Sequence, residues 1–336
     1  MALELATQLR TSQAQPEDPP GVPIDSIQPG GGLFFRIELG WSRLRRGWLR
    51  LARPGYVRRM AERRRGECPG CSHDILDPRD LKLWRNVCGH SFAEEDDAFA
   101  WRDRVRFARA GLCEVVVVSL VTWAVLAPSL AAWLGSGNRW FLGPAALAAV
   151  HWAFVLWFFR DPERTIAAAA DALLSPADGL ITHLEEVAAA DFPHGRAFRI
   201  SMWLSPLDVH LNRAPRDGRV VRTRYFPGRF VNARRADSAR INEQLWLDMV
   251  DSKDRQIRVI QISGSLARRL VCWVRAGEEL RSGARYGMIK YGSRCDVMLP
   301  AGDAIKLEVK VGDKVHAGTS VLLRYVEADG HPSARA

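Results

Sequence analysis

Residues 291–327, YGSRCDVMLPAGDAIKLEVKVGDKVHAGTSVLLRYVE, decide the fold class of this chain. Short apolar runs alternate here with turns that contain Gly, Asp or Pro, which is the pattern of short strands joined by tight connections. The same pattern extends back to about residue 161, and the polar stretch 238–250 is the only helix of note that we expect within it. Residues 161–330 are therefore predicted to form one compact α+β domain that is dominated by strands.

The end of this domain resembles a known architecture. Residues 309–323, VKVGDKVHAGTSVLL, place a strand, a Gly-Asp turn and a second strand in succession, as barrel-sandwich carrier domains do. A carrier domain needs a lysine at the tip of its hairpin, whereas Lys314 lies beside the turn at Gly312–Asp313. We therefore expect a barrel-sandwich-like C-terminal part without a carrier function.

The positive charge of the chain is concentrated near its beginning. The 336 residues carry a formal net charge of +10, and most of the excess precedes residue 66, within a basic amphipathic segment at 36–66. Arginines interleave there with tryptophan and leucine, which suits nucleic acid or an anionic membrane surface. Residues 1–35 are polar and rich in Pro and Gly, so we expect them to be disordered, without a signal peptide.

Two apolar segments favour the membrane over nucleic acid. Residues 113–134 and 140–159 each have about the length that crosses the hydrocarbon core, and only the short turn GSGNR separates them. A transmembrane hairpin is predicted within 111–160. Arginines before the first span and after the second place both ends, and the β-domain with them, at the cytoplasmic face of the cell membrane. Glu114 and His151 are single polar residues within the spans, where we expect interfacial or helix-packing positions.

A cysteine-containing module is predicted between these basic and apolar segments, at residues 67–105. The sequences CPGC and CGH bring two close pairs of soft ligands, which can occupy the corners of a tetrahedral zinc site. The candidate ligands are Cys68, Cys71, Cys88 and His90. The usual second pair of a zinc ribbon is CxxC, so the Cys-Gly-His spacing departs from it, and His73 is a competing ligand. Structural zinc is the resulting hypothesis.

Three polar positions in the β-domain are candidates for catalysis. Asp178 lies in the turn SPADG, His210 lies at a strand end in SPLDVHLNRAP, and Gly292–Ser293 interrupts an expected strand. Each alone has an ordinary structural interpretation, as a turn former, a core histidine and a bulge. An Asp, a His and a Ser at turns or strand ends, far apart in sequence, are also what a catalytic triad looks like before folding.

In their order and combination, these residues resemble the phosphatidylserine decarboxylase family. The shared motifs extend over nearly all of residues 158–327 and are FFRDPER, SPADG, SPLDVHLNRAP, YFPGRFVNA, INEQ, VIQISGSLARRLVCWV and YGSRCDVMLP. The branch with the smaller subunit, which includes archaetidylserine-type enzymes, fits best. In the larger class a second histidine follows three residues after the first, where this chain has Arg213. His210 is therefore the candidate base.

The resemblance implies that the chain is a proenzyme. Ser293, activated by His210 with Asp178 orienting the imidazole, would attack the Gly292 carbonyl and convert the amide to an ester. Elimination would then leave a pyruvoyl group at the new amino end of the fragment 293–336. Glycine before the serine crowds the carbonyl least and lets the backbone bend.

The resemblance also implies the substrate and the partners. The pyruvoyl ketone would condense with the amine of phosphatidylserine and accept the electrons that are released as CO2 leaves, which yields phosphatidylethanolamine. His210 is the nearest candidate acid to return a proton to the α-carbon. The cleaved chains 1–292 and 293–336 are expected to stay associated, and a homodimer is compatible with the sequence.

Three alternatives stay open at this point. The first is a membrane-tethered zinc-ribbon protein that binds nucleic acid and has an inactive β-domain with an uncut Gly292–Ser293 bond. The second is a pyruvoyl-dependent decarboxylase of a soluble amino acid, although a soluble substrate gives no reason for a membrane anchor. The third is a decarboxylase that acts on another lipid with an amino-acid headgroup.

Overall fold

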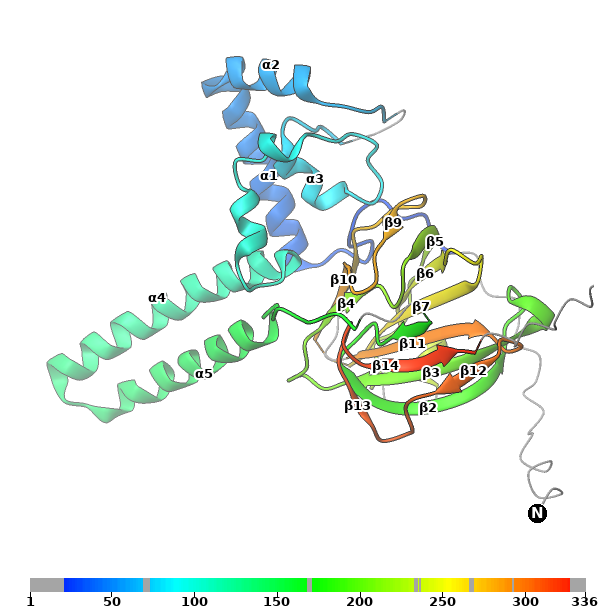
Figure 1. The fold of residues 1–336 in the computed structure, drawn as a ribbon. Coiled ribbons are helices and arrows are strands. Elements are labelled where there is room, and N and C mark those ends of the chain that lie inside the picture. The colour runs from blue at the N-terminus through cyan, green and yellow to red at the C-terminus, as the bar shows by residue number, and fades with distance from the viewer. Residues whose placement is uncertain are drawn as a thin grey trace, which may run out of the picture.

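The computed structural model describes residues 21–68, 73–167, 171–232, 235, 237–265, 269–291 and 293–326, without the side chains of Asp103 and Ser293. Cys71 and Gly292, both singled out from the sequence, lie outside the described residues. Figure 1 shows a β-domain, a pair of long helices that projects away from it, and a helical N-terminal part above the base of that pair. The predicted α+β class, with a β-rich domain and two apolar helices, is confirmed.

The N-terminal part consists of short and long helices joined by turns. Its α-helices are α1 (Leu33–Ala52), α2 (Pro54–Arg63) and α3 (Pro78–Trp84), followed by the 3-10 turns η1 (Glu94–Asp96), η2 (Ala100–Arg104) and η3 (Arg109–Gly111). An Asp77–Asp80 capping box begins α3, because both side chains accept backbone N–H groups at the helix start. Arg45 of α1 donates to Asp77 over 2.8 Å, so part of the arginine excess stabilises this part of the fold.

The prediction that residues 1–35 are disordered is wrong for residues 21–35, which are ordered in the structure. The backbone N–H of Val22 donates to the Tyr225 carbonyl over 2.8 Å, and the N–H of Cys272 donates to the Ile27 carbonyl over 2.9 Å. Ile27 is buried. Residues 21–32 are polar, but they add backbone hydrogen bonds and one apolar anchor to the β-domain, which composition alone does not reveal.

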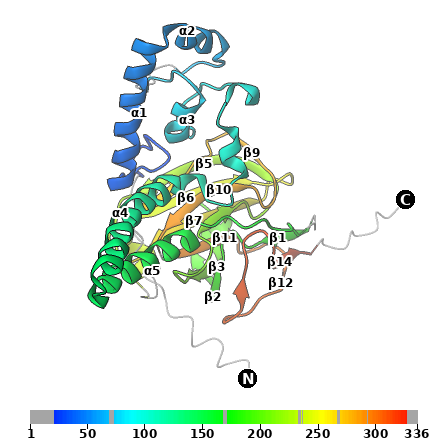
Figure 2. The same cartoon turned by 90° about the vertical axis from the view of Figure 1, so that its left-hand side faces the viewer.

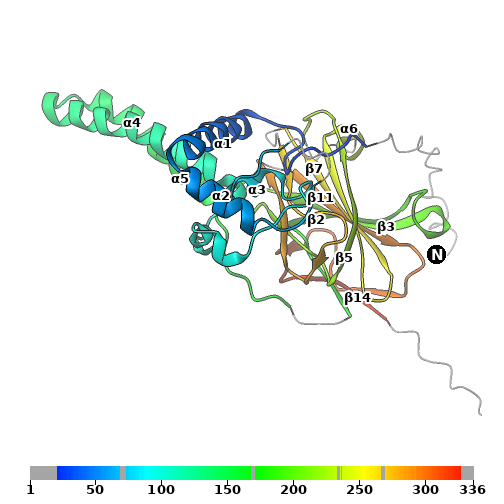
Figure 3. The ribbon, with the colours of Figure 1, turned by 90° about the horizontal axis from the view of Figure 1, so that it is seen from above.

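The two apolar helices form an antiparallel pair. They are α4 (Leu112–Ser136) and α5 (Leu142–Phe158), joined through the 3-10 turn η4 (Arg139–Phe141). Both are long and apolar enough to cross a membrane, with mean hydropathies of 2.2 and 1.7 for the spans that contain them. Seen from above, the pair extends away from the β-domain (Figure 3), and in Figure 2 it points toward the viewer. Most of its surface is uncovered.

The β-domain contains one large sheet and two small ones. Its strands are β1 (Ala172–Leu174), β2 (Gly179–Ala188), β3 (Arg196–Leu204), β4 (Leu211–Arg213), β5 (Gly218–Phe226), β6 (Gln244–Val250), β7 (Gln256–Ser263), β8 (Arg269–Cys272), β9 (Glu279–Leu280), β10 (Arg285–Lys290), β11 (Ser293–Pro300), β12 (Ile305–Leu307), β13 (Lys314–Val315) and β14 (Val321–Tyr325). The eight-stranded sheet has the order β13-β2-β3-β11-β7-β6-β5-β9, and the three-stranded sheets have the orders β1-β14-β12 and β4-β10-β8. The paired strands run antiparallel, so short connections suffice.

The helix expected at 238–250 is the second wrong prediction. Only α6 (Ser238–Ile241) is helical, and β6 follows from Gln244. Leu245, Leu247 and Met249 are all fully buried. This period-two alternation places alternate side chains on one face of a strand, and it outweighs the helix propensity of the polar neighbours.

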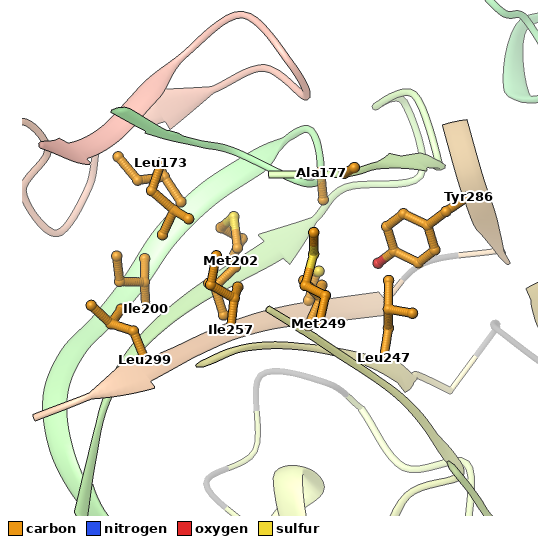
Figure 4. Close-up of a cluster of buried hydrophobic side chains, with 14 of the residues drawn as sticks. Leu173, Ala177, Ile200, Met202, Leu247, Met249, Ile257, Tyr286 and Leu299 are labelled. Carbon is orange, nitrogen blue, oxygen red and sulfur yellow. The ribbon is translucent and has the colours of Figure 1, made fainter. Parts of the chain in front are cut away.

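The main hydrophobic core lies between the large sheet and the small sheets. Figure 4 shows Leu173 and Ala177 on one side of this core, above Met202, Ile257 and Leu247 from the large sheet. These side chains are inaccessible to solvent. Burying each large one contributes roughly 1.5–3 kcal/mol, so the layered core holds the strand ends that carry the candidate site in fixed positions.

A second hydrophobic cluster joins the base of the helix pair to the β-domain. Phe158 and Phe159 pack there against Leu211 and Met288. Gly111 allows the closest approach, since a Cβ at that position would lie 1.9 Å from Cδ1 of Phe159. The N–H of Ala108 also donates to the carbonyl of Phe159 over 2.8 Å. The helix pair is thus packed against strands β4 and β10.

The predicted zinc-ribbon module receives no support from the described residues. Cys88 is buried and packs with Ile75, Leu83 and Trp84. The Nδ1 atom of His90 lies 3.0 Å from the Gly66 carbonyl oxygen. In the described ranges, no group of three or more His, Cys, Asp or Glu side chains is placed to hold a metal ion. The competing ligand His73 stacks on Trp84 with 4.4 Å between the ring centroids.

Candidate active site at the cleavage segment

Ser293 begins the central strand β11, directly after the chain has passed from one sheet to another. Lys290 ends β10 in a three-stranded sheet, and Ser293 starts β11 in the eight-stranded sheet. The backbone of Ser293 pairs with Leu204 of β3 and with Ser263 of β7. Because neighbouring strands fix β11 from both sides, the position of residue 293 is held by the backbone of the sheet.

The residue at the start of this crossing has a strained backbone. Tyr291 has a φ of 69°, in the left-handed region that bulky side chains rarely adopt. Such a conformation costs of order 1–3 kcal/mol and persists only where the surroundings enforce it. The surroundings here are aromatic: the Tyr291 ring stacks on Phe158 with centroids 4.7 Å apart and meets Phe159 edge-on at 5.9 Å.

The same phenylalanine also contacts the candidate base. The centroid of the His210 ring lies 4.3 Å from that of Phe158. His210 precedes β4, and its carbonyl accepts the N–H of Ile289 over 3.1 Å, which ties it to β10. The end of α5 therefore gathers His210 and Tyr291 around one ring, and the FFRDPER motif gains a structural purpose that its sequence did not reveal.

His210 is buried and neutral at physiological pH. The imidazole is inaccessible to solvent, and its Nδ1 atom lies 2.9 Å from the carbonyl oxygen of Asp208. A carbonyl only accepts, so Nδ1 carries the hydrogen and Nε2 carries the lone pair. Burial lowers the pKa of His210 to about 4, against the opposing effect of that hydrogen bond and of the Asp208 and Asp178 charges. A neutral imidazole with its lone pair on Nε2 is the form that can accept a proton.

The turn before His210 is built to present this carbonyl. The Asp208 carboxylate accepts the backbone N–H of Ser205 over 2.8 Å, as expected for an Asp that closes a local turn. Its other oxygen accepts from the Lys314 ammonium over 2.6 Å. Lys314 is the residue that we compared with the lysine of a carrier domain. Here it helps to hold the turn that orients the imidazole.

Asp178 lies at the start of β2, as the sequence predicted, but its partners are different from the expected one. Its Oδ2 accepts from Arg164 over 2.7 Å, and its Oδ1 accepts the N–H of Ala317 over 2.8 Å. The Nδ1 of His316 lies 3.4 Å from Oδ2. The sequence led us to expect a hydrogen bond between Nδ1 of His210 and the Asp178 carboxylate, but the partner of Nδ1 is the Asp208 carbonyl. The negative charge of Asp178 raises the pKa of His210 and so partly opposes the effect of burial.

Two residues of this group were missed from the sequence. Arg164 belongs to the FFRDPER motif, so its place next to SPADG could have been inferred from the motif set. His316 lies in the hairpin around β13, and only the pairing of β13 with β2 brings it to Asp178. Arg213, which replaces a second histidine, donates to the Gly283 carbonyl over 2.9 Å and is buried. Its role in the fold is structural.

A small cavity adjoins the cleavage segment. It has a volume of about 250 Å³, and Lys290, Tyr291, Glu114, Arg269 and Gln28 contribute to its walls. A larger cavity of about 910 Å³ lies between the N-terminal part and the β-domain. Lys290 and Tyr291 lead into the cleavage segment and line the small cavity but not the larger one, so the small cavity is the one next to the candidate site.

Comparison with known proteins identifies the family. The family model for phosphatidylserine decarboxylase matches residues 152–323. A phosphatidylserine decarboxylase proenzyme from Rhodopirellula baltica is 40% identical over 251 residues, which cover 73% of this chain and 99% of that protein. The chain belongs to the phosphatidylserine decarboxylase family. Proenzymes of the same name from Desulfotalea psychrophila and Symbiobacterium thermophilum are 42% and 40% identical over 51% and 52% of the chain, and over 78% and 85% of their own lengths.

The family match covers the last part of α5 and nearly all of the β-domain. The match begins within α5, at residue 152, and ends within β14, at residue 323. It therefore includes Phe158, Asp178, His210 and Ser293. The N-terminal helices and the cysteine-containing segment precede the match.

Proposed function

We propose that this protein is a membrane-bound phosphatidylserine decarboxylase, a carboxy-lyase that converts phosphatidylserine to phosphatidylethanolamine and CO2. One observation carries the proposal: in a member of this family, the buried neutral His210 and the strained Tyr291 pack on the same ring, that of Phe158, and Tyr291 is two residues before Ser293. Strain next to the bond to be broken and a proton acceptor at the same place are what self-cleavage requires.

Self-cleavage uses residues of this chain alone. The Ser293 hydroxyl gives its proton to Nε2 of His210 while its oxygen attacks the Gly292 carbonyl carbon. The C–N bond breaks, the nitrogen takes a proton, and an ester remains. Loss of the Cα proton of residue 293 then breaks the C–O bond, which releases a carboxylate on Gly292 and leaves dehydroalanine. Water replaces the nitrogen of this residue, which departs as ammonia, and a pyruvoyl group results.

Asp178 and the Asp208 carbonyl support His210 in two different ways. The carbonyl fixes the tautomer and the orientation of the ring by accepting from Nδ1–H. The negative charge of Asp178 favours the imidazolium that forms when Nε2 takes the proton, as its effect on the pKa of His210 indicates. Arg164 and the N–H of Ala317 hold Asp178 in place.

The pyruvoyl group supplies the electron sink that decarboxylation needs. The residues around position 293 suit such a group, because the sheet fixes its backbone and the neighbouring aromatic side chains limit access by water. In the second half of the reaction, His210 returns a proton to the α-carbon of the substrate. Its buried position near the cleavage segment makes it the nearest candidate for that step.

Membrane attachment follows from the apolar surface of the helices. We propose that α4 and α5 span the membrane, because large apolar side chains such as Leu120, Leu134 and Leu147 are exposed along them. An exposed apolar stripe on α1 follows a spacing of three and four residues and consists of Leu33, Ile37, Trp41, Leu44, Trp48 and Leu51. We propose that this α1 stripe lies in the interface of an anionic leaflet, on the cytoplasmic side.

The test is an assay of the full chain in lipid nanodiscs. Wild-type protein should release CO2 from phosphatidylserine and form phosphatidylethanolamine, and Ser293→Ala should do neither. Free serine should not be consumed. Decarboxylation of free serine would instead favour the alternative of a decarboxylase that acts on a soluble amino acid. Ether-linked lipids with a serine headgroup, run in parallel, distinguish the lipid backbones. Cleaved wild-type protein that forms no phosphatidylethanolamine would refute the proposed substrate.

A further inference from the structure

An acidic residue at the base of the helix pair has an unexpected partner. The sequence places Glu114 in the first apolar span, where an interfacial or helix-packing position is the ordinary interpretation. In the structure its side chain is buried, and Oε1 lies 2.5 Å from the Lys290 ammonium. Lys290 is also buried and is the last residue of β10. The pair therefore joins α4 to the segment that leads into the cleavage junction.

The next residue is held by the other helix of the pair. Tyr291 follows Lys290 and contacts Phe158 and Phe159 at the end of α5. Two consecutive residues directly before Gly292–Ser293 are thus fixed by α4 and by α5, one through an ion pair and one through ring stacking. The second of the two has the positive φ, a conformation that needs enforcement from its surroundings.

The ion pair is poorly arranged for stability alone. Removing two charges from water is costly, and apolar residues of similar volume are often as stable or more stable at such positions. Glu114 Oε2 is buried and has no hydrogen-bond partner among the described residues. A carboxylate that served only stability would be expected to satisfy both oxygens. The pair instead fixes the position of the Lys290 side chain, because a charge-assisted hydrogen bond restricts the end of a long, flexible lysine.

We infer that Glu114 and Lys290 are positioning residues for self-cleavage. The pair anchors the end of β10, so that Tyr291 stays in its left-handed conformation and the Gly292 carbonyl is presented to the Ser293 hydroxyl. This inference rests on the proposed function, because it assigns a role in the self-cleavage step. It also gives the helix pair a second purpose besides membrane attachment: its base forms one wall of the cleavage site.

The experiment compares the rate of cleavage with stability in the same set of variants. Full-length chains are synthesised in a cell-free system with nanodiscs, and precursor loss is followed on denaturing gels. Glu114→Gln and Lys290→Met each leave one buried partner unpaired and should slow cleavage by at least ~10-fold, as expected when a reacting group is displaced by about 1 Å or less. Lys290→Arg keeps the charge and should recover part of the rate.

The double variant Glu114→Gln/Lys290→Met separates positioning from stability. Both charges are gone, so its melting temperature, measured with Ser293→Ala added, should return to within a few degrees of the parent. Its cleavage should stay slow. A merely structural pair predicts that both quantities recover together, and wild-type cleavage kinetics in the double variant would overturn the inference.

A matched control uses an ion pair elsewhere in the domain. Arg216 and Asp251 lie 3.0 Å apart, and Arg216 contacts the ring of Tyr325 rather than the cleavage segment. Asp251→Asn should lower the melting temperature and leave the cleavage rate of the folded chains within about twofold of the wild-type rate. A wild-type chain that stays intact would refute self-cleavage itself, whereas normal cleavage of all pair variants would refute only the role of the pair.

Discussion

The buried imidazole of His210 makes a prediction about stability that depends on pH. In the unfolded chain this histidine titrates near 6.5, and in the folded protein burial lowers its pKa to about 4. Between these two values the unfolded chain binds one proton that the folded chain does not. Stability therefore falls as the pH is lowered through this window, and it stops falling through this group below about pH 4.

The size of the effect follows from the two pKa values. Each pKa unit corresponds to 1.36 kcal/mol, so a shift from 6.5 to about 4 amounts to about 3 kcal/mol of unfolding free energy lost between pH 7 and pH 4. His210→Phe keeps a ring against Phe158 and removes the titrating group. The unfolding free energy of the His210→Phe variant should lack the part of the pH dependence that is due to His210, whatever the stability of the variant at neutral pH.

The assay compares two uncleaved proteins, Ser293→Ala and Ser293→Ala/His210→Phe. Guanidinium unfolding in detergent is followed by tryptophan fluorescence at several pH values, and the difference between the two curves isolates His210, because all other groups titrate in both. The cleavage rate of the wild-type precursor should stay level from pH 7 to about pH 5 and fall near pH 4. Parallel stability curves, or a cleavage midpoint near 6.5, would show that His210 is not buried as a neutral base.

Three further predictions concern other parts of the molecule. Asp178→Asn removes the charge that pairs with Arg164 and should accumulate uncleaved precursor that is still folded, as a gel and a thermal melt can show; rapid cleavage would rule out a role for that charge. Asp248→Asn leaves the buried Arg258 guanidinium short of one partner and should cost about 3 kcal/mol of stability, while the chains that fold are cleaved at the normal rate. Trp48→Ser should reduce the fraction of tryptophan fluorescence that lipids brominated near the headgroup quench, and unchanged quenching would argue against membrane contact of the α1 stripe.

The sequence was sufficient for features that depend on local pattern. Turn residues between short apolar runs identified the β-dominated domain, and segment length identified two helices apolar enough to cross a membrane. Ordered motifs identified the family. Local pattern failed where tertiary packing decided the outcome, as at Leu245 and Leu247, whose alternation belongs to a central strand, and at Ile27, which anchors a polar segment.

The arrangement of the site depends on long-range contacts that no short motif encodes. Glu114 and Lys290 are 176 residues apart in the sequence and meet only because α4 packs beside β10. The partner of the His210 ring nitrogen is a backbone carbonyl, which every residue carries, so residue types could not distinguish it from a carboxylate. The sequence singled out Asp178, His210 and Ser293 as candidates, and the fold determines which contacts Asp178 and His210 make.

Mass analysis of the purified chain tests the central claim most directly. Self-cleavage predicts two chains, 1–292 and 293–336, which stay together until denatured. The smaller chain should be lighter by one ammonia than the same peptide with an amino-terminal serine, and it should react with a carbonyl reagent. An intact chain in a folded preparation, or a fragment that begins with an unmodified Ser293, would contradict the account.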